Sequence, residues 1–204
     1  MISNNKNANI YFFVKRALDI ILSCALLLFL LLPMLVIWLA VALSSSGGGF
    51  FLQERVGRGG KRFVCCKFRT MYKSAPVCSA RQMSELSDAS SYITPIGRFL
   101  RSTSLDELPQ LWNVLKGDMS LVGPRPLIAD EVEVHAAREQ MGVYRIRPGI
   151  TGLAQVQGRN SISDARKVEL DAKYLDEFGF LQDARILALT AIGVISRKDI
   201  DADS

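Results

Sequence analysis

An apolar stretch near the N-terminus limits what this chain can fold into. The residues from Ile20 to Leu43 include no charged side chain. At about 1.5 Å per residue, a helix of this length could cross a hydrocarbon layer of roughly 30 Å. The chain has 204 residues, 49% of them hydrophobic, and a mean hydropathy of +0.18. This composition excludes an intrinsically disordered protein and leaves room for one further domain.

Three kinds of segment fit this stretch. A cleaved signal peptide has an apolar region of only about 7–15 residues, although the Ala40-Val41-Ala42 triplet would suit a cleavage site. A single transmembrane helix with a proline kink is a common structure. A re-entrant, broken helix, which enters and leaves the membrane on one face, is favoured by Pro33 near the middle, because an interior proline removes a backbone hydrogen bond and kinks the helix.

Positive charges on both sides of the stretch also favour the re-entrant helix. Lys15 and Arg16 precede it, and between residues 51 and 79 seven cations oppose only Glu54. Positive flanks mark the cytoplasmic side of a membrane, so a helix with both ends there must turn back. The basic cluster would lie against anionic headgroups. The formal net charge of +5 favours anionic partners in general, such as phosphates, anionic lipid or nucleic acid.

Cysteine and histidine usage argues against a zinc site or a disulfide framework. The four cysteines form no CxxC pair, and His135 is the only histidine. We therefore expect reduced thiols, as in a cytosolic domain.

The chain after the apolar stretch predicts a small domain with more helix than strand. The segment Ser44–Gly49 consists of serine and glycine, which predicts a flexible hinge. The capping-box spacing of Ser104 and Glu107 predicts a helix that begins at Ser104, and Gly117 suits its C-terminal end. The remaining expectations are a hairpin of Phe51–Val56 with Arg62–Phe68, rigid turns at Gly123–Pro126 and Pro148–Gly152, and helices over Val168–Phe178 and Leu181–Ile195.

Two acids, Asp106 and Glu107, fall in the first turn of the helix expected from Ser104. Acids there commonly cap a helix and complement its dipole, which is the simplest explanation of the pair. Arginines surround them, however, and Arg125 is fixed between two prolines. A stiffly held arginine suits bidentate phosphate recognition. Carboxylates among arginines point to a phosphate held together with a hard divalent cation such as Mg²⁺.

Asp106 could also act as a nucleophile. An aspartate is ionised at neutral pH without the help of a base. Aspartyl phosphates are known covalent intermediates. The sequence alone does not separate a nucleophile from a metal ligand.

Several motifs in order resemble those of one protein family. The run SLDELPQLWNVLKGDMSLVGPRPL closely resembles the signature of the bacterial sugar transferases, the monotopic polyprenyl-phosphate phosphoglycosyl transferases. With the apolar segment, the likeness covers nearly the whole chain apart from residues 74–91, 129–144 and the tail. The other matching motifs are QERVG (Gln53–Gly57), KFRTM (Lys67–Met71), IGRFLR (Ile96–Arg101) and PGITGLAQVQGRN (Pro148–Asn160).

The resemblance implies a reaction and a set of site residues. Such enzymes move a sugar-1-phosphate from a nucleotide sugar, usually a UDP-sugar, to undecaprenyl phosphate and release UMP. They are thought to work through a phosphosugar-aspartate with Mg²⁺, at the start of exopolysaccharide, O-antigen, capsule or glycoprotein glycan assembly. The resemblance implies Asp106 as the nucleophile, Glu107 as its partner, Lys67, Arg101, Arg125 and Arg159 as phosphate or nucleotide ligands, and Asp171 with the two acids at the metal.

The resemblance also implies a fold and a location. The expected fold is α+β and predominantly helical. A small cytosolic catalytic domain with a short β-hairpin (residues 50–204) is anchored by an N-terminal re-entrant membrane helix and hinge (residues 1–49). The expected location is the bacterial inner membrane, with the catalytic domain facing the cytoplasm and homo-oligomers possible. Two departures from the family concern the anchor: Leu32 precedes Pro33 in place of serine, and Gly47–Gly49 replace a Gly-Pro, which predicts a looser link to the membrane.

Two other function classes remain open. A membrane-tethered binding protein for nucleic acid or anionic lipid would need aromatic residues interleaved with the basic stretch. Phe63 and Phe68 are too few for that, so no nucleic-acid partner is expected. An inactive scaffold that kept the fold would not need the intact pair of Asp106 and Glu107.

Overall fold

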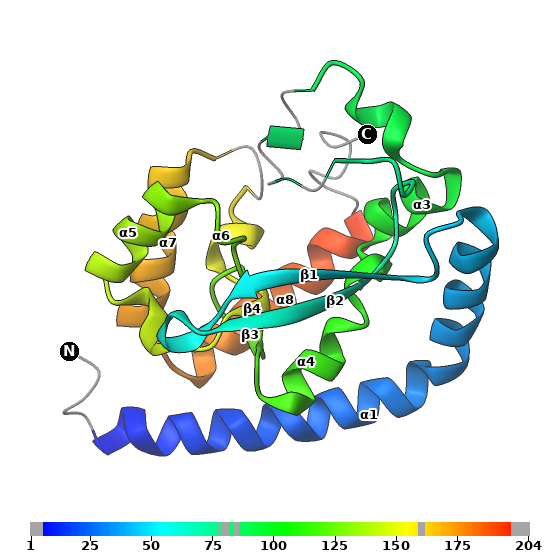
Figure 1. The fold of residues 1–204 in the computed structure, drawn as a ribbon. Helices are drawn as coiled ribbons and strands as arrows, with labels where there is room; N and C mark the ends of the chain where they lie inside the picture. Colours follow the sequence, from blue (N-terminus) through cyan, green and yellow to red (C-terminus); the bar gives the residue numbers. More distant parts are fainter. Residues whose placement is uncertain (1–5, 77, 79–81, 84–85, 159–161, 197–204) are drawn as a thin grey trace.

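A long N-terminal helix runs along one side of a mixed domain in the computed structural model of the chain (Figure 1). The structure describes residues 6–76, 78, 82–83, 86–158 and 162–196. In chain order the elements are α1 Lys6–Ser44, β1 Phe50–Val56, η2 Arg58–Gly60, β2 Arg62–Phe68, η3 Ala89–Tyr92, α3 Pro95–Thr103, η4 Leu105–Glu107, α4 Gln110–Lys116, β3 Ser120–Val122, α5 Val132–Gln140, η5 Val143–Arg145, β4 Gly149–Thr151, α6 Leu153–Val156, α7 Asp164–Asp176 and α8 Phe180–Ser196.

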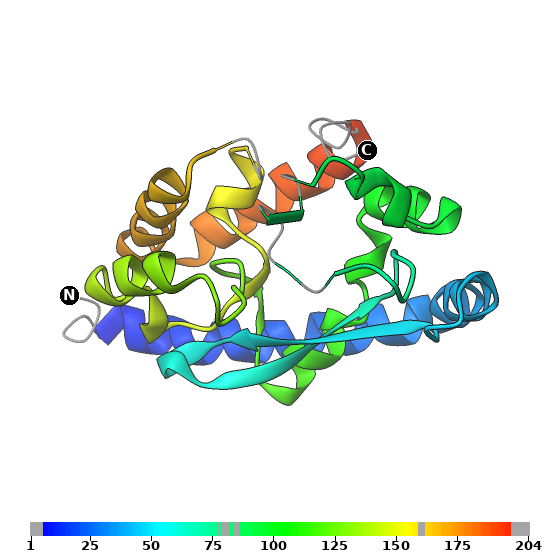
Figure 2. The ribbon, with the colours of Figure 1, turned by 45° about the horizontal axis from the view of Figure 1, so that its top comes forward.

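The helix α1 is continuous and contains Pro33 in its second half. Its last turns bend away from the direction of the first part in both views (Figures 1 and 2), as expected of a helix with an interior proline. The segment Ile10–Ser44 is long and apolar enough to cross a membrane, and only 6% of its most apolar window is buried in the protein. So much exposed apolar surface fits association with lipid. The re-entrant path stays a prediction.

The first half of α1 is joined to the domain by buried polar groups. Lys15 forms an ion pair with Asp183, and Asp183 also accepts a hydrogen bond of 2.6 Å from the Tyr174 hydroxyl. One turn further on, the buried Asp19 carboxylate accepts the Leu121 backbone N–H at 3.0 Å. Buried charges must be paired, so these contacts fix where α1 lies on the domain. The expected domain boundary at residue 49 stays a prediction. The first half of α1 packs against the domain formed by the residues after that boundary.

The segment Ser44–Gly49 differs from the expected flexible hinge. The Arg69 side chain donates to the Gly48 carbonyl at 3.2 Å, and its backbone N–H donates to the Gly49 carbonyl at 3.0 Å. A Cβ built on Gly49 would lie 2.4 Å from the Trp38 ring. The glycines therefore permit a close approach between the end of α1 and the hairpin, instead of loosening the connection.

The strands of the described residues form two sheets of two strands each. The expected hairpin is confirmed, with β1 and β2 antiparallel from the pair Phe50 and Phe68 to the pair Val56 and Arg62. The strands β3 and β4 are parallel to each other. The expected turn at Pro148–Gly152 therefore contains the strand β4. This strand forms because it pairs with β3, which lies far away in the sequence.

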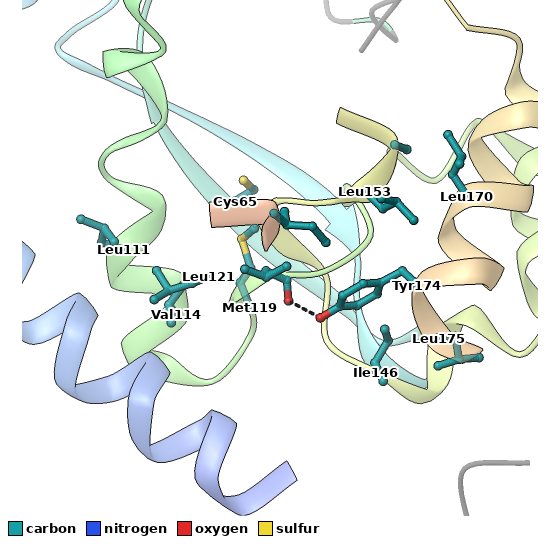
Figure 3. Close-up of a cluster of buried hydrophobic side chains, with 13 residues drawn as sticks. Cys65, Leu111, Val114, Met119, Leu121, Ile146, Leu153, Leu170, Tyr174 and Leu175 are labelled. Carbon is teal, nitrogen blue, oxygen red and sulfur yellow. Dashed lines mark hydrogen bonds between the residues drawn. The ribbon is translucent and has the colours of Figure 1, made fainter. Parts of the chain in front are cut away.

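The core lies where α4, α7 and α8 meet the strands (Figure 3). The Tyr174 hydroxyl reaches the Val122 carbonyl at 3.3 Å, so this large side chain also ties α7 to β3. The helices expected over Val168–Phe178 and Leu181–Ile195 are confirmed as α7 and α8, with somewhat different ends. The buried members of the core cluster are Cys65, Leu111, Val114, Met119, Leu121, Val122, Ile146, Leu153, Ala154, Leu170, Tyr174, Leu175 and Ile186.

Candidate active site

The two acids lie on a tight turn between two helices. The helix α3 ends at Thr103, and its C-cap residue is Ser104. The φ of 56° at Ser104 is the only positive φ of a non-glycine residue within the described ranges. The short 3₁₀ turn η4 then holds Asp106 and Glu107, and α4 begins only at Gln110. The prediction of one capped helix from Ser104 is therefore wrong. Pro109 explains the break, because inside such a helix it would lack an N–H and clash with a preceding carbonyl.

The backbone at Ser104 is strained. A left-handed conformation costs a non-glycine residue on the order of 1 kcal/mol. Such outliers persist where the surrounding structure enforces them, and they cluster at functional sites. Here the strained residue turns the chain so that Asp106 and Glu107 line a cavity together with Lys67 and Arg125.

Glu107 is bound by two cations from different parts of the chain. Lys67 Nζ, from β2, lies 2.5 Å from Glu107 Oε1. Arg125, from the Gly123–Pro126 turn, lies 3.4 Å from the same oxygen. These contacts bring together residues that are 40 and 18 positions apart in the sequence. Glu107 is thus positioned to orient the two cations at the cavity wall.

Asp106 differs from its neighbour in having no hydrogen bond or ion pair within the described part of the chain. The pKa of Asp106 is raised to about 6. Burial is the largest cause, the charge of Lys67 lowers the pKa, the charge of Glu107 raises it, and the charges of Arg101 and Arg125 lower it. A carboxylate with this pKa is mostly ionised at neutral pH yet less stabilised than an exposed one. The geometry leaves its oxygens available to attack an electrophile or to bind a metal ion.

The cavity that these residues line has a volume of about 1290 Å³. Its lining includes cations, with Arg98, Arg101 and Arg138 joining the residues already named. It also includes apolar side chains, among them Leu26 and Leu30 of α1. A phosphate-bearing group and an apolar chain can therefore both contact this cavity.

Asp171 does not join the two acids in the structure. It is 1% exposed, and its carboxylate lies 2.6 Å from the Arg138 guanidinium. Burial raises the pKa of Asp171, whereas Arg138 lowers it. Within the described residues no group of three or more His, Cys, Asp or Glu side chains could hold a metal ion. The three-acid set expected from the resemblance is therefore not assembled, and Arg159, expected at the nucleotide, lies outside the described residues.

Arg138 lines the site and was not predicted from the sequence. It lies on α5, lines the cavity and donates to the Arg125 carbonyl at 2.8 Å as well as to Asp171. Its helix, with the sequence VEVHAAREQ, shows no motif that distinguishes this arginine from a solvated surface residue. Only the packing of α5 on α7 reveals its place behind Arg125.

Comparisons with known proteins agree with the motifs. Residues 10–197 match the family described as bacterial sugar transferase. The chain is 40% identical, over 97% of its length, to a UDP-galactose-lipid carrier transferase of Erwinia amylovora, of which it spans 43%. It is 38% identical to a UDP-glucose:undecaprenyl-phosphate glucose-1-phosphate transferase of Caulobacter vibrioides, with 89% of this chain and 70% of that protein aligned.

A relative of similar length is also found. The chain is 40% identical to the uncharacterized sugar transferase EpsL of Bacillus subtilis, with 92% of this chain and 90% of that protein aligned. By contrast, the chain spans less than half the length of the Erwinia relative and of an undecaprenyl-phosphate galactose phosphotransferase of Salmonella typhimurium. Because the family match covers most of the chain, this protein belongs to the bacterial sugar transferase family.

Proposed function

We propose that this protein transfers a sugar-1-phosphate from a UDP-sugar to undecaprenyl phosphate, releases UMP and so initiates the assembly of a glycoconjugate such as exopolysaccharide. The observation that carries the proposal is the carboxylate of Asp106, which has no partner among the described residues, beside the Lys67–Glu107–Arg125 cluster in a cavity lined by both cations and apolar side chains. Both substrates are phosphates, and the acceptor carries a long apolar chain.

In the first proposed step, an oxygen of Asp106 attacks the phosphorus that carries the sugar. A bond forms between the carboxylate oxygen and phosphorus as the bond from that phosphorus to the oxygen of UMP breaks, and UMP departs with the electron pair. Lys67, Arg101 and Arg125 stabilise the charge that develops on the phosphate oxygens. The product on the protein is a phosphosugar-aspartate.

In the second proposed step, a phosphate oxygen of undecaprenyl phosphate attacks the same phosphorus. The bond to Asp106 breaks, the carboxylate is regenerated, and the sugar diphosphate remains on the lipid. The apolar side chains of Leu26 and Leu30, which line the cavity, would contact the first part of the lipid chain. This placement agrees with a domain held at the cytoplasmic face of the bacterial inner membrane by a re-entrant α1.

The two acids also fit a divalent cation. Mg²⁺ takes one or two carboxylates together with substrate phosphate oxygens, and Asp106 and Glu107 can supply these ligands. Such an ion would neutralise the diphosphate of the donor. Asp171 does not fit this role, because it is 1% exposed and is not among the residues that line the cavity.

The proposal is tested by isotope exchange without a lipid acceptor. The wild-type protein should incorporate labelled UMP into one member of a panel of UDP-sugars, and Asp106→Asn should reduce this exchange by at least 10³-fold. Asp130→Asn removes an exposed acid elsewhere and serves as the matched control. Exchange by Asp106→Asn at a rate close to that of the wild type would contradict the nucleophile assignment.

A further inference from the structure

A second, small cavity lies between α1 and the parallel strands. Its volume is about 20 Å³, and none of its lining residues belongs to the large cavity. A space of this size admits one water-sized group. The side chains with polar atoms that line it are Lys15, Arg16, Asp19, Arg58, Ser120 and Arg147.

The charges around this cavity do not balance. Lys15 is neutralised by Asp183. Asp19, whose carboxylate accepts the Leu121 N–H, is the one acid in the lining. It faces Arg16, Arg58 and Arg147, which belong to α1, to η2 and to the segment before β4. The described residues that line the site therefore carry a net positive charge, which a bound anion would neutralise.

Two of the arginines are held in place by the end of α4. Arg16 donates to the Val114 and Leu115 carbonyls at 2.7 and 3.1 Å, and Arg147 Nε donates to the Gly117 carbonyl at 2.8 Å. These contacts use carbonyls at a helix C-terminus, where cations are favourable. They leave the terminal nitrogens of Arg147 without a hydrogen-bond partner among the described residues. Burial and then the charges of Arg16 and Arg58 lower the pKa of Arg147.

An unsatisfied hydroxyl lines the same cavity. Ser120 is 1% exposed, and its Oγ has no hydrogen-bond partner among the residues that the structure describes. A buried hydroxyl without a partner destabilises the fold. A water molecule could accept its hydrogen bond but would leave the three arginines uncompensated. The oxygen of an anion would satisfy both requirements.

The position of the cavity along α1 suggests where the anion comes from. Arg16 precedes Ile20, the first residue of the charge-free stretch, by about one helical turn. If α1 enters the membrane there, this turn lies at the level of the headgroups, where cations contact lipid phosphates.

We propose that Arg58, Arg147 and Ser120, together with Arg16, form a binding site for a phosphate group. One phosphate oxygen would accept the Ser120 hydroxyl inside the cavity. The other oxygens would contact the arginines at its mouth, as guanidinium groups bind phosphates. The headgroup of a phospholipid is the source that the position favours. The site is separate from the active site and does not depend on the proposed function.

The test uses the full chain purified in an uncharged detergent. Thermal unfolding is measured during titration with a short-chain phosphatidylglycerol or with inorganic phosphate. The wild-type Tm should rise with the ligand. The apparent affinity should fall at least tenfold in Arg58→Gln and Arg147→Gln, whereas Lys61→Gln, which removes an exposed cation next to η2, should behave as the wild type.

Ser120→Ala gives a signature that does not depend on charge. Without ligand its Tm should be higher than that of the wild type, because an unpaired buried hydroxyl is lost. With ligand its Tm should rise less. UMP exchange by Arg58→Gln in detergent should be unchanged, which separates this test from that of the active site.

The outcomes separate the two phosphate sources. A rise in Tm with phosphatidylglycerol alone supports a lipid headgroup, and a rise with inorganic phosphate as well supports a general phosphate site. The proposal is overturned if neither ligand raises the wild-type Tm. It is also overturned if the wild type, Arg58→Gln, Arg147→Gln and Ser120→Ala respond equally, since the anion would then bind elsewhere.

Discussion

The Asp171 carboxylate lies 2.6 Å from the Arg138 guanidinium, and the same guanidinium donates to the Arg125 carbonyl at 2.8 Å. Arg125 in turn contacts Glu107. A buried acid on α7 is thus connected to the two-acid turn through two arginines. We infer from this arrangement that Asp171 is a positioning residue that acts through Arg138.

The first prediction concerns this buried pair. Asp171→Asn leaves the Arg138 charge buried without its partner, and it should lower the free energy of unfolding by about 3 kcal/mol. Denaturant unfolding measures this loss. Glu169→Gln, on the exposed face of the same helix, should change the stability by less than about 0.5 kcal/mol.

The dependence on Mg²⁺ distinguishes the two roles of Asp171. If Asp171 positions Arg138, Asp171→Asn should slow UMP exchange without changing the Mg²⁺ concentration that gives half-maximal exchange. A variant of wild-type stability that needs at least tenfold more Mg²⁺ would instead identify Asp171 as a metal ligand.

The second prediction concerns the charge of Lys67. Lys67 lowers the pKa of Asp106, so its removal in Lys67→Met should raise that pKa. In the proposed reaction only the ionised Asp106 attacks, so the acid limb of the pH–rate profile for exchange should move to higher pH. Lys67→Arg retains the charge and should keep the limb near its wild-type position. A limb unmoved in Lys67→Met would show that exchange does not report on Asp106.

The third prediction concerns the stability cost of the buried Asp106. Its pKa is about 6 in the folded protein, against the ordinary value of 3.8 for an aspartate. The folded state therefore binds the proton more tightly, and stability is lost as the pH rises from about 4 to above 6. Asp106→Asn removes the ionised form, so it should stabilise the protein at pH 7.5 by up to about 3 kcal/mol.

Measuring the free energy of unfolding at two pH values checks whether Asp106→Asn stabilises the protein as predicted. In the presence of a metal chelator, the difference in unfolding free energy between Asp106→Asn and the wild type should be near zero at pH 4 and largest at pH 7.5. A variant that is less stable than the wild type at pH 7.5 would contradict the raised pKa.

The fourth prediction concerns the connection after α1. A Cβ on Gly49 would lie 2.4 Å from the Trp38 ring and 2.9 Å from the Trp38 carbonyl. Gly49→Ala should therefore destabilise the protein by about 2 kcal/mol through overpacking. Gly193→Ala, where no atom of the described residues lies within 4 Å of the added carbon, should be neutral or stabilising. Equal Tm values for Gly49→Ala and the wild type would support the flexible hinge after all.

Local patterns predicted the elements that depend on neighbouring residues. The two β-rich runs on either side of Gly57–Lys61 form the hairpin, and Gly117 ends α4 with a φ of 93°. The family motifs also predicted that Lys67, Glu107 and Arg125 belong to one site. In the structure Lys67 and Arg125 both contact Glu107.

Long-range contacts decided the features that the sequence did not predict. The strand β4 forms because Ser120 and Val122 lie beside Gly149 and Thr151. Arg138 becomes a site residue only because α5 packs on α7. The capping-box pattern at Ser104 was misleading, because the effect of Pro109 on the helix outweighed the favourable cap.

The most direct test of the account is a search for the covalent intermediate at Asp106. The full chain is incubated with its UDP-sugar and without lipid acceptor, quenched in acid and digested, and the peptide that contains Asp106 is examined by mass spectrometry. The account predicts a mass increase of one sugar phosphate on this residue in the wild type and none in Asp106→Asn. Release of UMP by a protein whose Asp106 stays unmodified at every time point would contradict it.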